Sequence, residues 1–143
     1  MENIFKRPDV INKEVAITEM QSFVERWTYE KPERWKVEED YPQVLKAIEK
    51  GILVFDEDSQ PIYTLAFPIK TDEGNDAVSK IEFRTRIKPT DLANITKGLN
   101  VAKQQVEYTL RCLSYITGQN RVMLDKFDKF DYKAIEQIST VFF

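Results

Sequence analysis

The spacing of apolar side chains changes twice along this chain, and the order of these changes limits the folds that it can adopt. Up to Gly51, apolar residues recur every three or four positions, as they do along one face of a helix. From Ile52 to Ile87 they form short runs or alternate with polar residues, which is typical of strands. Beyond residue 90 the helical spacing returns. This order predicts an α+β fold with an antiparallel sheet, because alternating βαβ units would mix the two periods throughout the chain.

Two helices are expected before the strands. Residues 13–29 carry one apolar helical face, formed by Ile17, Met20, Val24 and Trp27. A polar connection is expected over residues 30–40, since a proline soon after the first helix disfavours helical dihedrals in the residue before it. The second helix would begin with Asp40 as its cap and Pro42 in its first turn, and it would end at Gly51.

A three-stranded antiparallel meander is expected next. Its strands would cover residues 52–55, 62–67 and 81–88, separated by turn-forming clusters at 56–60 and 71–76. In the third strand, apolar residues alternate with charged ones, so one face would meet the core and the other would meet water.

The outer face of this third strand carries a basic stripe: Lys80, Arg84, Arg86 and Lys88, interrupted by Glu82. Such a stripe can dock an acidic partner or nucleic-acid phosphates. The ordinary alternative is a solvated sheet face. We single out Arg84 and Arg86 as candidate partner contacts, because a guanidinium group can bind a carboxylate through two parallel hydrogen bonds.

Three or four helices are expected after the strands, packed against the meander. A short helix would run from a cap at Thr90 to Lys97, and a long one would cover residues 100–117. The long helix would bury one stripe of side chains, formed by Ala102, Val106, Leu110, Leu113 and Ile116. Asp131 would cap the last helix.

The chain contains no histidine and one cysteine, Cys112. These counts exclude histidine-based catalytic triads, histidine-ligated metal sites, zinc sites with several thiolates and a disulfide within the chain. Asp125, Asp128 and Asp131 are spaced to offer oxygen ligands to a cation, but helix capping is the more common role of such residues. Two Asp or Glu residues can act as a general acid and a general base, but no such pair in this chain lies in a catalytic motif. We therefore expect no enzymatic activity, no cofactor and no metal site.

Aromatic side chains gather near the C-terminus: Phe127, Phe130, Tyr132, Phe142 and Phe143. Aromatic residues most often belong to a core. Terminal segments usually fray, so the last two phenylalanines either fold back onto the domain or bind a partner. We keep all five as candidate partner contacts and expect deletion of residues 141–143 to weaken partner binding more than it lowers stability.

Charge is distributed unevenly along the chain, whose formal net charge is −3. Residues 1–75 carry 10 basic and 16 acidic side chains, whereas residues 76–143 carry 11 and 8, which suggests two halves with different uses. The longest apolar run, residues 52–55, is too short for a signal peptide or a membrane helix, and the start of the chain has no such run. We expect a soluble, cytoplasmic protein.

A series of short motifs follows Pro61 in a defined order. They are Ile62-Tyr63-Thr64-Leu65, Phe67-Pro68-Ile69, Ile81-Glu82-Phe83-Arg84-Thr85-Arg86, Lys88-Pro89-Thr90-Asp91-Leu92, Leu113-Ser114-Tyr115-Ile116-Thr117-Gly118, Leu124-Asp125-Lys126-Phe127, Phe130-Asp131-Tyr132 and Phe142-Phe143. In order and spacing, residues 61–143 resemble the small tail assembly chaperones of Mu-like and related contractile-tailed phages. The shared positions are hydrophobic and turn residues rather than catalytic ones.

This resemblance implies a protein that binds the tape-measure protein in the host cytoplasm, keeps it soluble, and leaves before or as the tail tube polymerises. Members of such families are often made in two forms through a ribosomal frameshift, so a longer form of the protein itself is another candidate partner. A homo-oligomer is left open, and neither nucleic acid nor a membrane is expected as a partner. Residues 1–60, a helical extension plus the first strand, exceed the family pattern. The alternative is therefore a structural tail or baseplate component of the virion.

Overall fold

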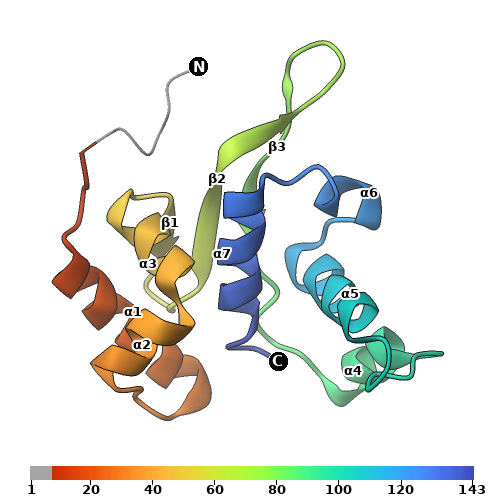
Figure 1. Ribbon diagram of the computed structural model, residues 1–143, viewed down its shortest axis with the longest axis horizontal. Coiled ribbons are helices and arrows are strands. Elements are labelled where there is room, and N and C mark those ends of the chain that lie inside the picture. The colour runs from red at the N-terminus through yellow and green to blue at the C-terminus, as the bar shows by residue number, and fades with distance from the viewer. Residues whose placement is uncertain (1–7) are drawn as a thin grey trace.

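Three antiparallel strands lie near the centre of the computed structural model, which describes residues 8–143 (Figure 1). The start of the chain, on which part of the signal-peptide prediction rests, lies outside these residues. The elements are α1 (Lys13–Thr28), α2 (Arg34–Asp40), α3 (Pro42–Glu49), β1 (Leu53–Phe55), β2 (Pro61–Lys70), β3 (Asp76–Glu82), α4 (Pro89–Thr96), α5 (Gln105–Thr117), α6 (Arg121–Leu124) and α7 (Lys129–Ser139). The expected α+β class, the N-terminal helices, the meander and the C-terminal helices are confirmed.

The elements form three groups in the view of Figure 1. Helices α1, α2 and α3 lie on one side, and α4, α5 and α6 lie on the other, with β2 and α7 between them.

Among residues 8–143, no helix is both long enough and apolar enough to cross a membrane.

The sheet has the order β1-β2-β3, with β2 paired antiparallel to both neighbours. Its pairing with β3 is irregular, because Thr64 pairs with Lys80 whereas Ile69 pairs with Val78. Four residues of β2 therefore stand opposite one residue of β3, which makes a large β-bulge. The bulge interrupts the regular ladder at residues 65–68 and leaves backbone groups there for other partners.

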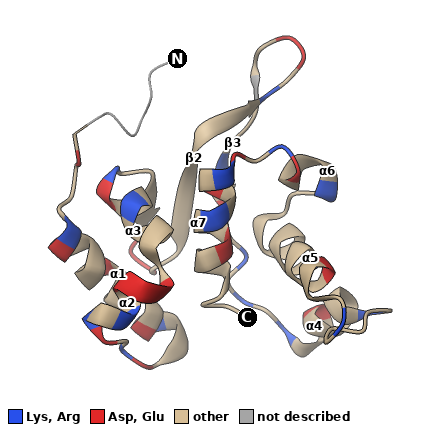
Figure 2. Cartoon of the chain, in the orientation of Figure 1, with Lys and Arg blue, Asp and Glu red and all other residues tan. Residues whose placement is uncertain are grey.

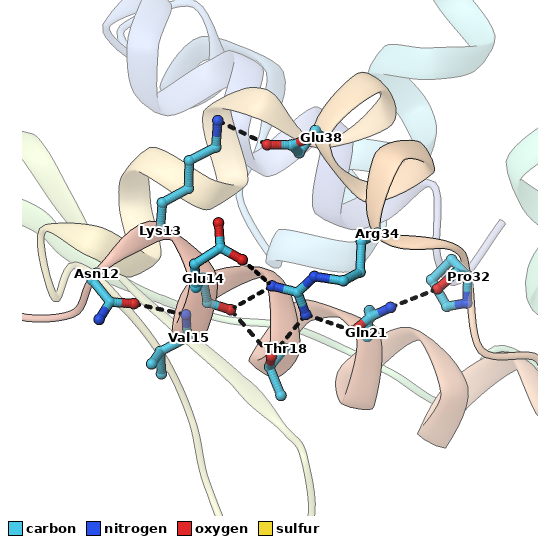
Figure 3. Close-up of polar contacts among 9 residues, drawn as sticks. All are labelled: Asn12, Lys13, Glu14, Val15, Thr18, Gln21, Pro32, Arg34 and Glu38. Atoms are coloured by element: carbon cyan, nitrogen blue, oxygen red, sulfur yellow. Dashed lines mark hydrogen bonds and ion pairs between the residues drawn. The ribbon is translucent and has the colours of Figure 1, made fainter.

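A helix, α2, occupies most of the stretch expected to be a polar connection. Only Val37 of this helix is buried, so it lacks the apolar stripe that would have predicted it. Polar contacts with α1 fix it instead (Figure 3): the guanidinium of Arg34 donates to the Glu14 carboxylate at 2.7 Å and to the Thr18 hydroxyl at 3.0 Å. Lys13 forms a 2.8 Å ion pair with Glu38.

The first turn of α3 is capped from a distant part of the chain. The residue before the helix is Tyr41 rather than the expected Asp40, and it makes no side-chain cap. The side-chain oxygen of Gln137, on α7, accepts the backbone N–H groups of Gln43 at 3.0 Å and Val44 at 3.3 Å. Two N–H groups that the helix itself cannot satisfy are therefore bound by a residue more than 90 positions away.

The hydrophobic core joins both halves of the chain. Its largest fully buried side chains are Tyr63, Phe23, Met20, Ile48, Leu53, Ile81, Leu113, Ile116, Ile135, Ile138, Val37 and Val44. Helices α1 and α3 thus bury their apolar faces in the same cluster as α5, α7 and the sheet. The N-terminal helical extension is built into the core of residues 61–143 rather than attached to its surface.

The third strand has other bounds than the sequence pattern predicted. Strand β3 covers Asp76–Glu82 rather than residues 81–88, so only Lys80 of the basic stripe lies on it. Arg84, Arg86 and Lys88 lie beyond it, and the backbone N–H of Arg84 donates to the Ile116 carbonyl at 2.8 Å. Pairing with the C-terminal end of α5 thus replaces pairing with β2.

The long helix begins at Gln105 rather than at residue 100. A turn precedes it, in which Asn100 donates its N–H to the Gln104 side chain at 2.9 Å and accepts that of Lys103. The predicted buried stripe is wrong at its start, since Ala102 and Val106 are exposed.

The caps of the two other C-terminal helices also differ from expectation. Lys88, not Thr90, precedes α4, and its backbone N–H donates to the Asp91 carboxylate at 2.9 Å. Asp128, not Asp131, caps α7 by accepting the N–H of Phe130 at 2.9 Å. Asp131 is fully buried and points away from its own helix end toward the sheet.

Candidate partner-binding groove

Helices α4 and α5 are tied together by Arg111. Its Nη1 donates to the carbonyl oxygens of Ile95 at 3.1 Å and Lys97 at 2.7 Å, at the end of α4. Its Nε donates to Glu107, one helical turn earlier, at 3.3 Å. Arg111 therefore satisfies carbonyl groups that α4 leaves free at its C-terminus, where a cation is also favoured by the helix dipole.

A groove of about 710 Å³ lies among α4, α5 and the turn before α6. Its walls carry three arginines, Arg84, Arg111 and Arg121, and two carboxylates, Asp91 and Glu107. Figure 2 shows both signs of charge on the helices of this part of the molecule. Cations outnumber anions in the groove, in a chain whose net charge is negative.

Glu107 and Arg121 close one side of the groove. Nη1 of Arg121 lies 2.9 Å from both carboxylate oxygens of Glu107, and Arg111 donates to the same carboxylate. The hydrogen bond from Arg121 is the main reason that the pKa of Glu107 is lowered. Glu107 stays ionised and offsets part of the charge of the two arginines.

Arg84 forms the other side of the groove. Its guanidinium lies 5.1 Å from the centre of the Tyr115 ring, which is a cation–π contact. The Asp91 carboxylate raises the pKa of Tyr115, and the nearby Arg84 guanidinium acts in the opposite direction. The pKa of Asp91 is lowered, first by the N–H of Lys88 and then by Tyr115. The guanidinium of Arg84 thus rests on an aromatic ring, with the Asp91 carboxylate on the same side of the groove.

The structure separates the candidate contacts named from the sequence. Arg84 lines the groove, whereas Arg86 is exposed outside it. Phe127, Phe130, Tyr132 and Phe142 are partly buried and pack against the core. Phe143 is 37% exposed and lines a separate pocket of about 340 Å³ between α5 and α7. The sequence interpretation missed Arg111, Tyr115 and Arg121, and the only local signal was the helical spacing of Glu107 and Arg111.

Asp131 is a structural residue. Its carboxylate accepts the N–H groups of Ala66 and Phe67 at 3.0 Å each, within the β2 bulge, and the Tyr63 hydroxyl at 2.7 Å. Burial raises the pKa of this carboxyl, although the three donors oppose the shift. In the part of the chain that the structure describes, no group of three or more aspartate, glutamate or cysteine residues gathers to hold a metal ion.

Cys112 is a buried free thiol beside Tyr108. Burial raises the pKa of this thiol, which lowers the fraction of the reactive thiolate at neutral pH. Its surroundings are those of a core side chain rather than of a nucleophile.

Comparisons of this chain with protein-family models, curated proteins and solved structures gave no match.

Proposed function

We propose that the protein is a phage tail assembly chaperone that binds the tape-measure protein in the host cytoplasm and keeps it soluble during tail assembly. The ordered motifs of residues 61–143 are the first support. A tape-measure protein is a long helical chain with apolar stripes, and a partner that keeps it soluble must offer apolar surface to cover them.

The observation that carries the proposal is the exposure of three aliphatic side chains on the helices that form the groove, outside its lining. Leu92 on α4, Val106 on α5 and Val122 on α6 are 39%, 76% and 64% exposed. Val106 lies in the first turn of α5 and is the most exposed of the three. Aliphatic side chains left in water on three neighbouring helices suit the docking of an amphipathic partner helix.

Co-expression with the tape-measure protein tests this proposal. The wild-type chain should copurify with that protein and raise its soluble fraction. The double variant Val106→Ser with Val122→Ser should reduce capture, since it removes apolar contact area without opening the core. The matched control is Val15→Ser with Val54→Thr, which changes two exposed valines on α1 and β1 and should capture the client normally. Equal loss in both double variants would contradict the proposed surface.

A structural tail or baseplate component is the second candidate. Helices α1 and α3 lie outside the family pattern, yet they pack into the same core as residues 61–143. This favours a structural protein over a family chaperone with an added segment. Mass spectrometry of purified virions separates the two functions, because abundant protein in mature particles would contradict a chaperone that leaves. We also propose that a T-rich, slippery nucleotide run encodes Phe142-Phe143 and allows a frameshifted longer form. Non-repetitive codons at these two positions would contradict this.

A further inference from the structure

We infer that the groove among α4, α5 and α6 binds carboxylates of an acidic protein segment, with the guanidinium of Arg84 as the main contact. The choice of a protein as ligand rests on the proposed function. The groove, its charges and its supporting contacts do not depend on that choice.

Arg84 is held in position without an anionic side chain at ion-pair distance. Its backbone is fixed by the 2.8 Å hydrogen bond to Ile116, and its guanidinium lies on the Tyr115 ring. Among the side chains that the structure describes, no carboxylate lies within 4 Å of its guanidinium nitrogens, although Arg84 is near enough to Asp91 to contribute to the lowered pKa of that carboxyl. Gly118 lies beside this guanidinium: a Cβ atom added to Gly118 would be 3.8 Å from Nη2 of Arg84. An arginine arranged in this way can offer a fork of N–H donors at little further entropic cost.

Arg121 supplies a second donor edge. In the described part of the chain, Nη1 is the only nitrogen of its side chain that donates a hydrogen bond, and it donates to Glu107. Arg111, by contrast, is used within the fold, because its Nη1 and Nε bind two carbonyl groups and Glu107. The groove therefore presents donors from Arg84 on one wall and from Arg121 on the other.

The charges of the groove favour a peptide over a nucleic acid. Asp91 and Glu107 line the same walls as the arginines, and they would repel a backbone that carries a phosphate at every nucleotide. Carboxylates on a peptide are spaced by neutral residues and can avoid them. Asn94, Ser114 and Asn120 also line the groove. The Ser114 hydroxyl donates to the Gln119 carbonyl and the Asn120 side-chain oxygen caps α6, so the groups left for a peptide backbone are the Asn94 amide, the Asn120 amide N–H donors and the Ser114 oxygen as an acceptor.

Fluorescence anisotropy with labelled probes tests the inference on the full chain. The probes are a helical peptide with glutamate on one face, the same peptide with glutamine in place of each glutamate, and a single-stranded oligonucleotide. We expect the glutamate peptide to bind the wild type more tightly than the other two. Arg84→Gln should weaken its binding about tenfold, as the loss of a charge-assisted pair of hydrogen bonds requires.

Arg86→Gln is the matched control, because it removes the same charge two residues away at an exposed position outside the groove. It should change affinity by less than about twofold. Equal effects of the two variants, or tighter binding of the oligonucleotide, would overturn the inference. If Arg84→Gln lowers the melting temperature, Arg84→Lys decides instead: it keeps the charge but not the fork, so binding as tight as wild type would overturn the role of the guanidinium.

Capture of the tape-measure protein by the same variants separates this inference from the proposed function. If Arg84→Gln loses the glutamate peptide but captures the client normally, the groove is not where the client binds, and the chaperone function stands. If the wild type captures no client but binds the glutamate peptide through Arg84, the carboxylate site stands and the proposed function fails.

Discussion

The Tyr63 hydroxyl donates a 2.7 Å hydrogen bond to the carboxylate of Asp131, and both residues are completely buried. The same carboxylate accepts two backbone N–H groups from the bulge in β2. One side chain on α7 thus satisfies donors that the sheet ladder leaves unpaired. A buried donor without a partner costs free energy, so the bulge and the aspartate depend on each other.

The substitution Asp131→Asn should lower the free energy of unfolding by about 1–3 kcal/mol. An asparagine has the same shape, but its amide group is itself a donor and would face the N–H of Phe67 or of Ala66. Urea denaturation measures the change. Asp128→Asn is the matched control, because asparagine caps a helix as well as aspartate does, and it should change stability by less than about 0.5 kcal/mol. Equal losses would mean that the bulge contacts are not specific.

The pH dependence of stability should carry a component from Asp131. Burial raises the pKa of this carboxyl above its ordinary 3.8, while Tyr63 and the bulge N–H groups act against the shift and Asp128 adds to it. The folded chain therefore binds this proton more readily than the unfolded chain. The contribution of the group to stability is full below its ordinary pKa and is lost as pH rises through the folded-state pKa.

Because asparagine does not titrate, the difference in unfolding free energy between the wild type and Asp131→Asn isolates this component. The wild type should hold a larger advantage at about pH 4 than at about pH 7. Denaturant titrations of both proteins at the two pH values check the sign. An advantage that grows with pH would show that the three hydrogen bonds outweigh burial.

The period of the apolar residues was enough to predict the fold class, the meander and part of the core, because burial of a repeating face is a local property. It could not predict α2, whose position depends on Arg34 reaching back to α1. Nor could it reveal the bulge in β2 or the buried role of Asp131. In sequence, that aspartate looks like any acidic residue in the first turn of a helix.

The groove was equally hidden from the sequence. The sequence pattern singled out Arg84 as a candidate contact but placed it on the third strand, which ends two residues before it. Its partner ring Tyr115 lies on α5, and Arg121 meets Glu107 from 14 residues away. Contacts between residues so far apart in the sequence arise when the elements pack together. The local spacing of residues does not predict them.

Gln137 offers a test of the long-range cap on α3. The variant Gln137→Ala leaves the N–H groups of Gln43 and Val44 without this acceptor and should cost about 1 kcal/mol. Gln137→Glu keeps an acceptor oxygen and adds negative charge at a helix N-terminus, so it should be at least as stable as the alanine variant and close to the wild type. Thermal unfolding of the three proteins gives the order. If the alanine variant matches the wild type, water replaces the cap at no cost.

The two C-terminal phenylalanines should behave differently. Phe142 packs edge-on against Phe23, with ring centres 5.8 Å apart, and against Trp27 at 5.5 Å. Phe142→Ala should therefore lower the free energy of unfolding by about 1–3 kcal/mol, less than for a fully buried ring, because its side chain is only partly buried. Phe143 is more exposed, so Phe143→Ala should cost much less stability.

Client binding then separates the roles of these two residues. If Phe143 contacts a partner, Phe143→Ala should weaken capture of the tape-measure protein while the unfolding curve stays close to that of the wild type. Deleting residues 141–143 would combine the two effects, because it removes a packed ring together with an exposed one. Single variants are needed for this reason. Normal capture by Phe143→Ala would remove this residue from the client surface and leave Phe142 as a core side chain.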